Sequence, residues 1–114
     1  MITKVVAMLE YGCYPVWLYD EEGLVEDTLL PEELRNDTEL DSQFDDLQAR
    51  YDALFINNEN EFSYAGFKSQ REKDLFIHDW VKAIEELRKK LDKKYEFSDQ
   101  TADILSLTVV DSKI

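Results

Sequence analysis

The chain has 114 residues, and its 44% hydrophobic content with 14 aromatic side chains excludes a disordered acidic tail. Its net charge of −13 falls entirely on residues 1–67, where 16 acidic residues stand against three basic ones, Lys4, Arg35 and Arg50. Residues 68–114 carry ten charges of each sign, so the chain builds a directional field that attracts basic partners and repels nucleic acid and anionic membranes.

Cysteine content and the lack of long apolar segments favour a cytoplasmic protein. The single cysteine, Cys13, cannot form an internal disulfide, and no charged-then-apolar signal segment precedes Ile2. No apolar run approaches the roughly 20 residues that a membrane helix requires. A chain of this length buries enough surface to fold without a metal or a disulfide. We therefore expect a single globular domain over residues 1–114, located in the cytoplasm.

The first part of the chain predicts a strand followed by a β-hairpin. The apolar run at residues 5–9 is short and β-branched at its start, which favours a buried strand. Residues 14–19 alternate, and apolar residues resume at Leu24 after four polar residues that end in Gly23. This pattern is typical of a hairpin whose turn needs a glycine with positive φ. Pro31, followed by two glutamates, then predicts a short helical turn.

From Thr38 the apolar spacing changes to that of an α-helix. Either Asp37 or Thr38 suits the N-cap position. Six apolar side chains fall within about 100° of arc and form one stripe: Leu40, Phe44, Leu47, Tyr51, Leu54 and Phe55. The polar residues 57–60 end this helix, and the alternation over residues 61–67 predicts a strand.

A capping box opens the second and longest predicted helix. In this motif the hydroxyl of Ser69 and the carboxylate of Glu72 satisfy each other's backbone donors at the helix start. The helix is predicted to run to about Lys94, with one apolar stripe: Phe76, Trp80, Ala83, Ile84, Leu87 and Leu91. The lysines near its end complement the negative helix terminus, so we interpret them as a solvated helix end rather than a nucleic-acid site.

The order of elements predicts the fold class. Residues 105–109 alternate and predict a last strand, so the order is strand, hairpin, helix, strand, long helix, strand. We expect an α+β fold in which a mostly antiparallel sheet is packed on one side by two amphipathic helices, as a single two-layer domain.

The residue inventory argues against an enzyme. One histidine and one cysteine cannot assemble a zinc site of several Cys and His ligands, and the three isolated glycines form no phosphate loop. His78 falls on the predicted solvent face of the long helix, and Cys13 is expected to act as a small buried hydrophobe. Residues 57–61 have the initial spacing of a calcium loop, but Phe62 stands where that loop needs glycine. We predict no catalytic residue, no metal and no cofactor.

An acidic ridge on the first predicted helix is one candidate partner-binding surface. Four polar side chains line one flank of the apolar stripe and define this ridge: Asp41, Asp45, Gln48 and Asp52. Like charges at i,i+4 destabilise a helix, and the only basic residue on this helix, Arg50, lies on the other flank. A locally unfavourable face suggests a partner that supplies positive charge. The alternative is a solvated face kept for solubility.

The predicted hairpin is the second candidate surface. Besides Tyr11 and Tyr14, it contains the residues that we assign to partner binding: Trp17, Tyr19, Asp20, Glu21 and Glu22. Aromatic anchors rimmed by charge have the composition of a protein-binding hot spot. The alternation leaves open whether Trp17 and Tyr19 or Val16 and Leu18 face the core, and the first pair is available to a partner only if the second is buried.

Two segments resemble the small immunity proteins that accompany bacterial polymorphic toxins. They are Gly12-Cys13-Tyr14-Pro15-Val16-Trp17-Leu18-Tyr19-Asp20 and Glu61-Phe62-Ser63-Tyr64-Ala65-Gly66-Phe67. Size, acidity and the order of elements are similar as well. The resemblance implies a cytoplasmic protein that binds one cognate toxin domain, often a basic nuclease, and blocks its active site or a surface beside it. It transfers no catalytic or contact residue.

The sequence leaves three functions open. The leading hypothesis is an acidic binding protein that neutralises a basic protein, above all a cognate toxin domain, and binds neither nucleic acid nor membrane. Homo-oligomer formation stays open. The second hypothesis is a nucleic-acid mimic or adaptor that binds a basic regulator, which requires carboxylates spaced like phosphates. The third is a small-ligand protein or an enzyme that uses carboxylates in an apolar pocket.

Overall fold

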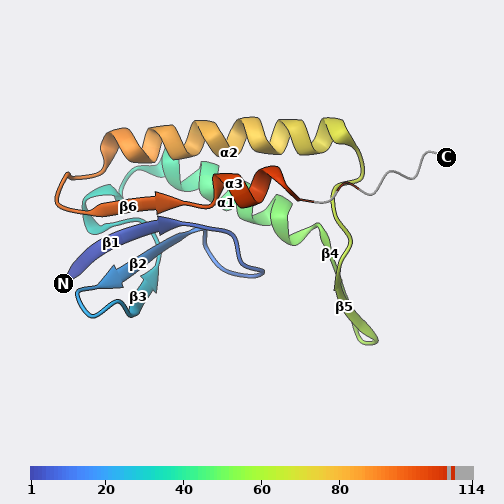
Figure 1. Cartoon of the computed structure of the whole chain (residues 1–114), viewed down its shortest axis with the longest axis horizontal. Coiled ribbons are helices and arrows are strands. Elements are labelled where there is room, and N and C mark those ends of the chain that lie inside the picture. The colour runs from blue at the N-terminus through green and yellow to red at the C-terminus, as the bar shows by residue number, and fades with distance from the viewer. Residues whose placement is uncertain (108, 110–114) are drawn as a thin grey trace.

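Four strands form the main sheet of the computed structural model, which describes residues 1–107 and 109 (Figure 1). They are β1 (Ile2–Ala7), β2 (Val16–Asp20), β3 (Val25–Thr28) and β6 (Glu96–Asp99), in the order β3-β2-β1-β6. β2 is antiparallel to both β1 and β3, whereas β6 is parallel to β1. The sheet is therefore mixed, and its antiparallel part consists of the predicted strand and hairpin.

The two predicted amphipathic helices pack against each other and cover one face of this sheet (Figure 1). The helical elements of the described chain are the 3₁₀ turn η1 (Glu32–Leu34), α1 (Thr38–Asp52), α2 (Gln70–Lys90) and the short α3 (Thr101–Leu105). Both long helices begin at predicted caps. Asp37 Oδ1 accepts the N–H of Leu40 at 3.0 Å, and Ser69 Oγ accepts the N–H of Glu72 at 3.1 Å.

The core lies between the main sheet and these two helices. The helices supply most of the predicted stripe residues to it: Leu40, Phe44, Leu47, Phe76, Trp80, Ala83, Ile84 and Leu87. Trp80 is fully buried, and its indole Nε1 donates to Thr101 Oγ1 at 3.0 Å, so its one polar atom is satisfied. From the sheet, Val5, Ala7, Val16 and Leu18 face the helices.

This core decides which face of β2 points inward. Val16 and Leu18 are buried, so Trp17 and Tyr19 lie on the opposite face of the sheet, where both are half-buried. The aromatic pair is therefore accessible to a partner in part, as partner binding requires.

A second, two-stranded sheet projects from the body of the protein as a hairpin (Figure 1). It consists of β4 (Phe55–Asn58) and β5 (Glu61–Tyr64), which pair antiparallel. The prediction that the first helix extends through Phe55 is wrong, because α1 ends at Asp52 and Phe55 begins β4. Leu54 stays in the core between the two elements.

Backbone pairing explains where the first helix ends. The carbonyl oxygen of Leu54 accepts the N–H groups of Ala65 and Gly66 at 2.7 and 3.1 Å, which directs the chain after α1 into a strand. The predicted strand at residues 61–67 is confirmed over β5, and Phe67 forms an isolated parallel bridge with Val109.

The predicted last strand at residues 105–109 is wrong. The strand that joins the main sheet is β6, which lies earlier in the chain and pairs with β1. Asp99 Oδ1 then accepts the N–H of Thr101 at 2.9 Å, α3 follows, and Leu105 is its last residue. Residue 108 lies outside the described residues. Phe97 is the only apolar residue of β6, so its sequence shows little alternation of apolar and polar residues. Pairing with β1 makes this segment a strand.

The long helix is shorter than predicted. α2 ends at Lys90 rather than near Lys94, and Leu91 has extended backbone angles. The Lys90 ammonium reaches Asp37 Oδ2 at 2.6 Å, so the end of α2 is joined to the N-cap of α1. The predicted α+β class, with two helices on one side of a sheet, is confirmed. None of the helices among the described residues combines the length and the apolar character that a membrane span needs.

Candidate functional site

The acidic ridge of α1 faces the loop between β1 and β2. Gln48 is buried, and its Nε2 donates to the carbonyl oxygen of Glu10 at 2.7 Å and to Asp52 Oδ1 at 2.8 Å. The same Asp52 oxygen accepts the N–H of Gly12 at 2.9 Å. These hydrogen bonds fasten the last turn of α1 to the loop. Gln48 and Asp52 therefore anchor the fold, which the helical spacing alone did not indicate.

Tyr14 fastens the other end of the ridge. Its hydroxyl donates to Asp41 Oδ1 at 2.8 Å. Burial, and then the hydrogen bond to Asp41, raise the pKa of Tyr14, so the phenol stays protonated and remains a donor. Asp45 is exposed and has no hydrogen bond or ion pair within the described residues, and desolvation and the charge of Asp41 raise its pKa. Asp45 is therefore the ridge carboxylate most available to a partner.

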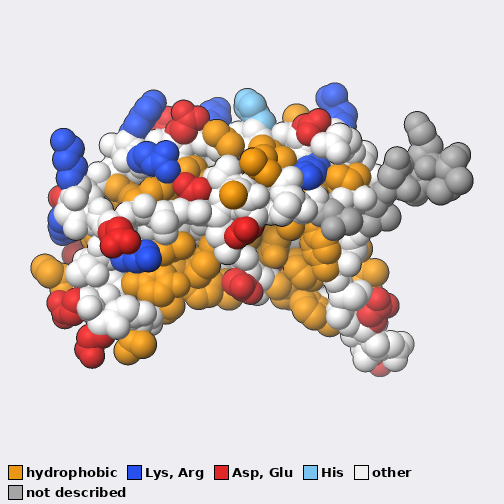
Figure 2. Space-filling model, viewed as in Figure 1, with side chains coloured by type: hydrophobic (Ala, Val, Ile, Leu, Met, Phe, Trp, Pro, Cys, Tyr) orange, Lys and Arg blue, Asp and Glu red, His pale blue; other side chains and the backbone are white. Residues whose placement is uncertain are grey.

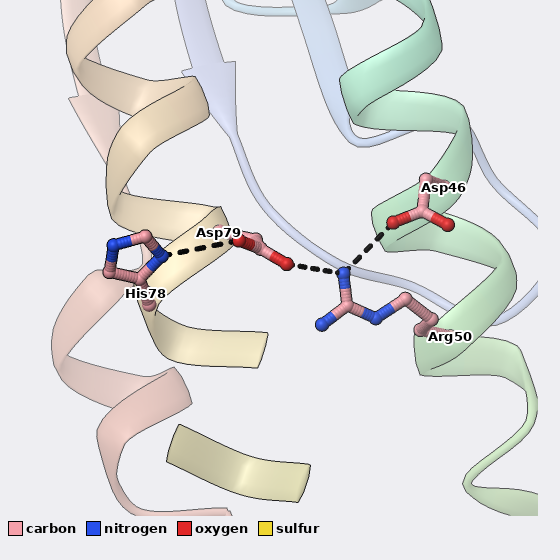
Figure 3. A network of polar contacts seen from close by, with 4 residues as sticks. All are labelled: Asp46, Arg50, His78 and Asp79. Carbon is pink, nitrogen blue, oxygen red and sulfur yellow. Dashed lines mark hydrogen bonds and ion pairs between the residues drawn. The ribbon is translucent and has the colours of Figure 1, made fainter. Parts of the chain in front are cut away.

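The opposite flank of α1 is joined to α2 by ion pairs (Figure 3). Arg50 Nη1 lies 2.9 Å from Asp46 Oδ2 and 2.8 Å from Asp79 Oδ2, and the other Asp79 oxygen lies 3.2 Å from His78 Nδ1. Burial raises the pKa of Asp79, but hydrogen bonds from Arg50 and His78 outweigh it and hold this pKa below its usual range. His78 is exposed, as predicted. This flank is locally paired, so we interpret it as a contact between the helices.

The acidic residues assigned to partner binding in the β2–β3 turn have different surroundings. Asp20 closes the turn, because its Oδ1 accepts the N–H groups of Glu22 and Leu24 at 2.9 and 3.0 Å. Gly23 has the predicted positive φ, 82°. Glu21 lies 3.7 Å from the N-terminal amine, and the side chain of Glu22 is exposed. Asp20 thus has a structural role, while Glu21 and Glu22 lie at the surface.

Trp17 and Tyr19 are on the sheet face that points away from the helices. In the register of the sheet they lie opposite Val6 and Lys4 of β1. The Trp17 Nε1 atom is buried and has no hydrogen-bond partner among the described residues. Since the ridge lies on a helix that packs against the other face, the structure does not bring the ridge and this aromatic pair together.

A cluster of aromatic rings on the β4–β5 hairpin is a candidate surface that sequence reasoning missed. The aromatic cluster consists of Tyr11, Tyr51, Phe55, Phe62 and Tyr64. Phe55 lies at its centre, with ring centroids 5.0 Å from Tyr11 and 5.5 Å from the stacked Phe62. Asn57 Nδ2 donates to the Tyr11 hydroxyl at 3.0 Å and so holds the β1–β2 loop against the hairpin. Phe62 is 57% exposed and Tyr11 is 36% exposed.

A sequence signal for part of this cluster exists. Apolar residues on both sides of the polar residues 57–60 are a hairpin pattern. Phe55 also fits the helical stripe of α1, so the pattern assigns it to the helix and β4 is not predicted. Tyr11 joins the cluster from a distant loop, and no local spacing connects it with Phe62.

The acidic ridge leads directly to the aromatic cluster. Asp52, the last ridge residue, holds the N–H of Gly12, and the neighbouring Tyr11 is a member of the cluster. Burial, and then the charge of Glu10, raise the pKa of Tyr51. Figure 2 shows basic side chains gathered along the edge formed by α2 and hydrophobic ones along the opposite, hollowed part of this face. Acidic side chains lie at both projecting ends of that part.

The described residues offer surfaces for binding. Within residues 1–107 and 109, no three His, Cys, Asp or Glu side chains are grouped to hold a metal ion. Cys13 is half-buried in the β1–β2 loop, where its N–H donates to the carbonyl oxygen of Glu10 at 3.1 Å. The ridge and the adjoining aromatic cluster form the main candidate site.

Comparison with known protein families identifies one family that matches most of this chain. The family described as Serratia CdiI immunity protein-like matches residues 3–99. The chain belongs to this family. The resemblance to immunity proteins of bacterial toxin systems is thereby confirmed. No curated protein matches the chain at a level that would indicate a relative.

The match to the Serratia CdiI immunity protein-like family extends over the main sheet and both long helices. It begins in β1 and ends at the last residue of β6, so it includes the acidic ridge, both hairpins and the aromatic cluster. α3 follows the matched region. Both candidate surfaces of this immunity protein-like chain therefore lie within the family match.

Proposed function

We propose that this chain is an immunity protein that binds a cognate toxin domain and neutralises it in the cytoplasm. The family match is the observation that carries this proposal, and it favours immunity over the nucleic-acid mimic and the small-ligand protein. The charge of −13 on residues 1–67 further supports a basic toxin domain. Nucleases fit this description, because surfaces that bind nucleic acid carry Lys and Arg for the phosphate backbone.

The charge distribution suggests how such a complex forms and inhibits. Unpaired carboxylates such as Asp45 attract a basic surface before contact and raise the association rate. Once bound, the acidic half of the immunity protein covers basic groups of the toxin domain and repels the phosphates of its substrate. Inhibition therefore needs no chemical step by the immunity protein.

Co-expression tests the immunity function directly. The probe is the toxin domain encoded immediately upstream of this chain's reading frame, produced in bacterial cells with and without the chain. We expect growth arrest by the toxin domain alone and growth when both are present. An unrelated protein with the same net charge is the control and should not protect. If the purified domains do not bind and the cells are not protected, the immunity function is wrong.

The salt dependence of binding tests whether the partner is basic. We expect the association rate to fall steeply as salt rises toward 0.5 M, where the Debye length is about 4 Å. The measurement is surface-immobilised kinetics of the two purified domains at several salt concentrations. An association rate that does not change with salt would show a toxin domain without a basic binding surface, while protection of cells would still support immunity.

A further inference from the structure

The exposed rings of the aromatic cluster need an explanation beyond folding. Single exposed apolar residues are normal, but a contiguous apolar surface on a small protein marks a binding site or an aggregation risk. Phe62 is 57% exposed although its ring contacts both Phe55 and Tyr11. The hydrogen bond from Asn57 to Tyr11 holds the loop against these rings. A preorganised aromatic surface of this kind is suited to recognition.

The segment that carries most of the aromatic cluster is acidic. Residues 51–67 contain three acidic residues and neither Lys nor Arg, and Lys68 follows Phe67. Of the three acids, Glu61 lies on the hairpin face opposite the rings. Glu10 adds a further carboxylate beside Tyr11, and its charge contributes to the raised pKa of Tyr51. The closest basic residue in sequence on the N-terminal side, Arg50, is paired with Asp46 and Asp79 on the other flank of α1. Residues 51–67 therefore supply aromatic faces and carboxylates but no positive charge.

The aromatic rings and carboxylates of this surface indicate which kind of group binds there. A cation over an aromatic face is attracted by the negative face of the ring, and arginine is the residue found there most often. A second copy of this chain is disfavoured, because symmetric contact through this face would place acidic rims against each other. A partner that brings positive charge is therefore the complementary one.

We propose that the aromatic cluster is the centre of the toxin-binding surface and receives an arginine side chain of the cognate toxin domain between Phe62, Tyr11 and the carboxylates beside them. This inference rests on the proposed immunity function and adds its contact site. The acidic ridge then guides the approach, and the cluster holds the bound partner. Residues assigned from the sequence, Trp17 and Tyr19, lie on another surface and are peripheral to this contact.

The two faces of the β4–β5 hairpin provide a matched test. Phe62 and Ile56 are both exposed, but the strand pairing places Ile56 beside Ser63 on the face opposite the rings. We expect Phe62→Ala to weaken binding of the upstream toxin domain by about tenfold or more, as for a hot-spot residue. Ile56→Ala should bind within about twofold of wild type. The measurement is isothermal titration calorimetry with the purified domains, and circular dichroism confirms that each variant is folded.

A third variant separates the ring from its apolar bulk. Phe62→Leu keeps an apolar side chain on the hairpin and removes the aromatic face, so we expect it to weaken binding as well. Wild-type affinity of Phe62→Leu would show that no cation is bound by the ring. Wild-type affinity of Phe62→Ala, or an equal loss in Ile56→Ala, would place the interface elsewhere while immunity stands. Failure of the wild-type protein to bind or protect would instead overturn immunity and this site together.

Discussion

The two hairpins of this protein have similar local patterns and different surroundings. In β2–β3, Val16 and Leu18 are covered by the helices and belong to the core. In β4–β5, the ring-bearing face contacts Tyr11 and Tyr51, and Phe62 remains largely exposed. Alternation predicts that a segment is a strand, but it does not predict what covers the apolar face. An apolar face that the fold leaves open is available for a partner.

The position of each hairpin in the sheets accounts for this difference. β2 lies between β1 and β3, whereas among the described residues β4 and β5 pair only with each other. Since an isolated two-stranded hairpin is marginally stable in water, β4–β5 depends on its attachments at Leu54 and Tyr11.

The acidic residues also differ in whether the fold supplies them with hydrogen-bond partners. Asp52 and Asp37 are held in hydrogen bonds by the fold, while Asp45 is left without such a partner among the described residues.

The largest expected effect is a loss of stability when a buried apolar side chain, rather than an exposed one, is truncated. Leu18→Ala should lower the free energy of unfolding by about 2–5 kcal/mol, because it empties a filled position in the core. Phe62→Ala should cost less than about 1 kcal/mol, since most of this side chain is already in water. Urea unfolding monitored by circular dichroism measures both. Equal losses would show that the β4–β5 hairpin is part of the core.

The next effect concerns the acid that attaches the β1–β2 loop to α1. Asp52→Ala removes the acceptor of the Gly12 N–H and the Gln48 amide and should cost about 1–2 kcal/mol of unfolding free energy. Asp45→Ala is the matched control on the same ridge and should stay within about 0.5 kcal/mol of wild type. Thermal unfolding compares the two variants. If both were neutral, the loop would not depend on the ridge.

A smaller effect distinguishes the acidic half from the balanced half in partner binding. Asp45→Lys should lower the association rate with the upstream toxin domain by about threefold or more, because it reverses a charge that we propose faces the partner. Lys89→Glu on the exposed face of α2 should change this rate by less than about twofold. Surface-immobilised kinetics at low salt measures both. A slower association for the α2 variant would place the interface on the long helix.

The smallest expected effect is a pH dependence of stability at the N-cap of α1. The hydrogen bond from Lys90, and then the N–H of Leu40, hold the pKa of Asp37 below its usual range. A lowered carboxyl pKa adds stability that is complete above the unfolded value of about 4 and is lost as pH falls through the folded value. The Tm of Asp37→Asn should therefore fall slightly less than that of wild type between pH 5 and pH 2, on the order of a few degrees or less. A parallel fall in both proteins would show that this carboxylate does not contribute.

Local sequence determined the helices, the caps and the charge of this protein. The apolar stripes of α1 and α2 follow the spacing of a helix over most of their length, and Asp37 and Ser69 cap the helices with their own side chains. Gly23 takes the positive φ of the turn because it has no Cβ. The immunity resemblance also lay in the sequence. All these features depend on residues close together in the chain.

Tertiary structure decided the features that depend on distant segments. β6 is a strand because β1 offers it a parallel partner, and α1 stops at Asp52 because the chain returns through Ala65 to bond Leu54. The aliphatic side chains of β2 face inward because the helices cover them. Likewise, Tyr11 and Phe62 meet only in the folded protein. Hydrogen-bond pairing and burial act between segments far apart in the chain. The local spacing of residues therefore does not predict which segments pair.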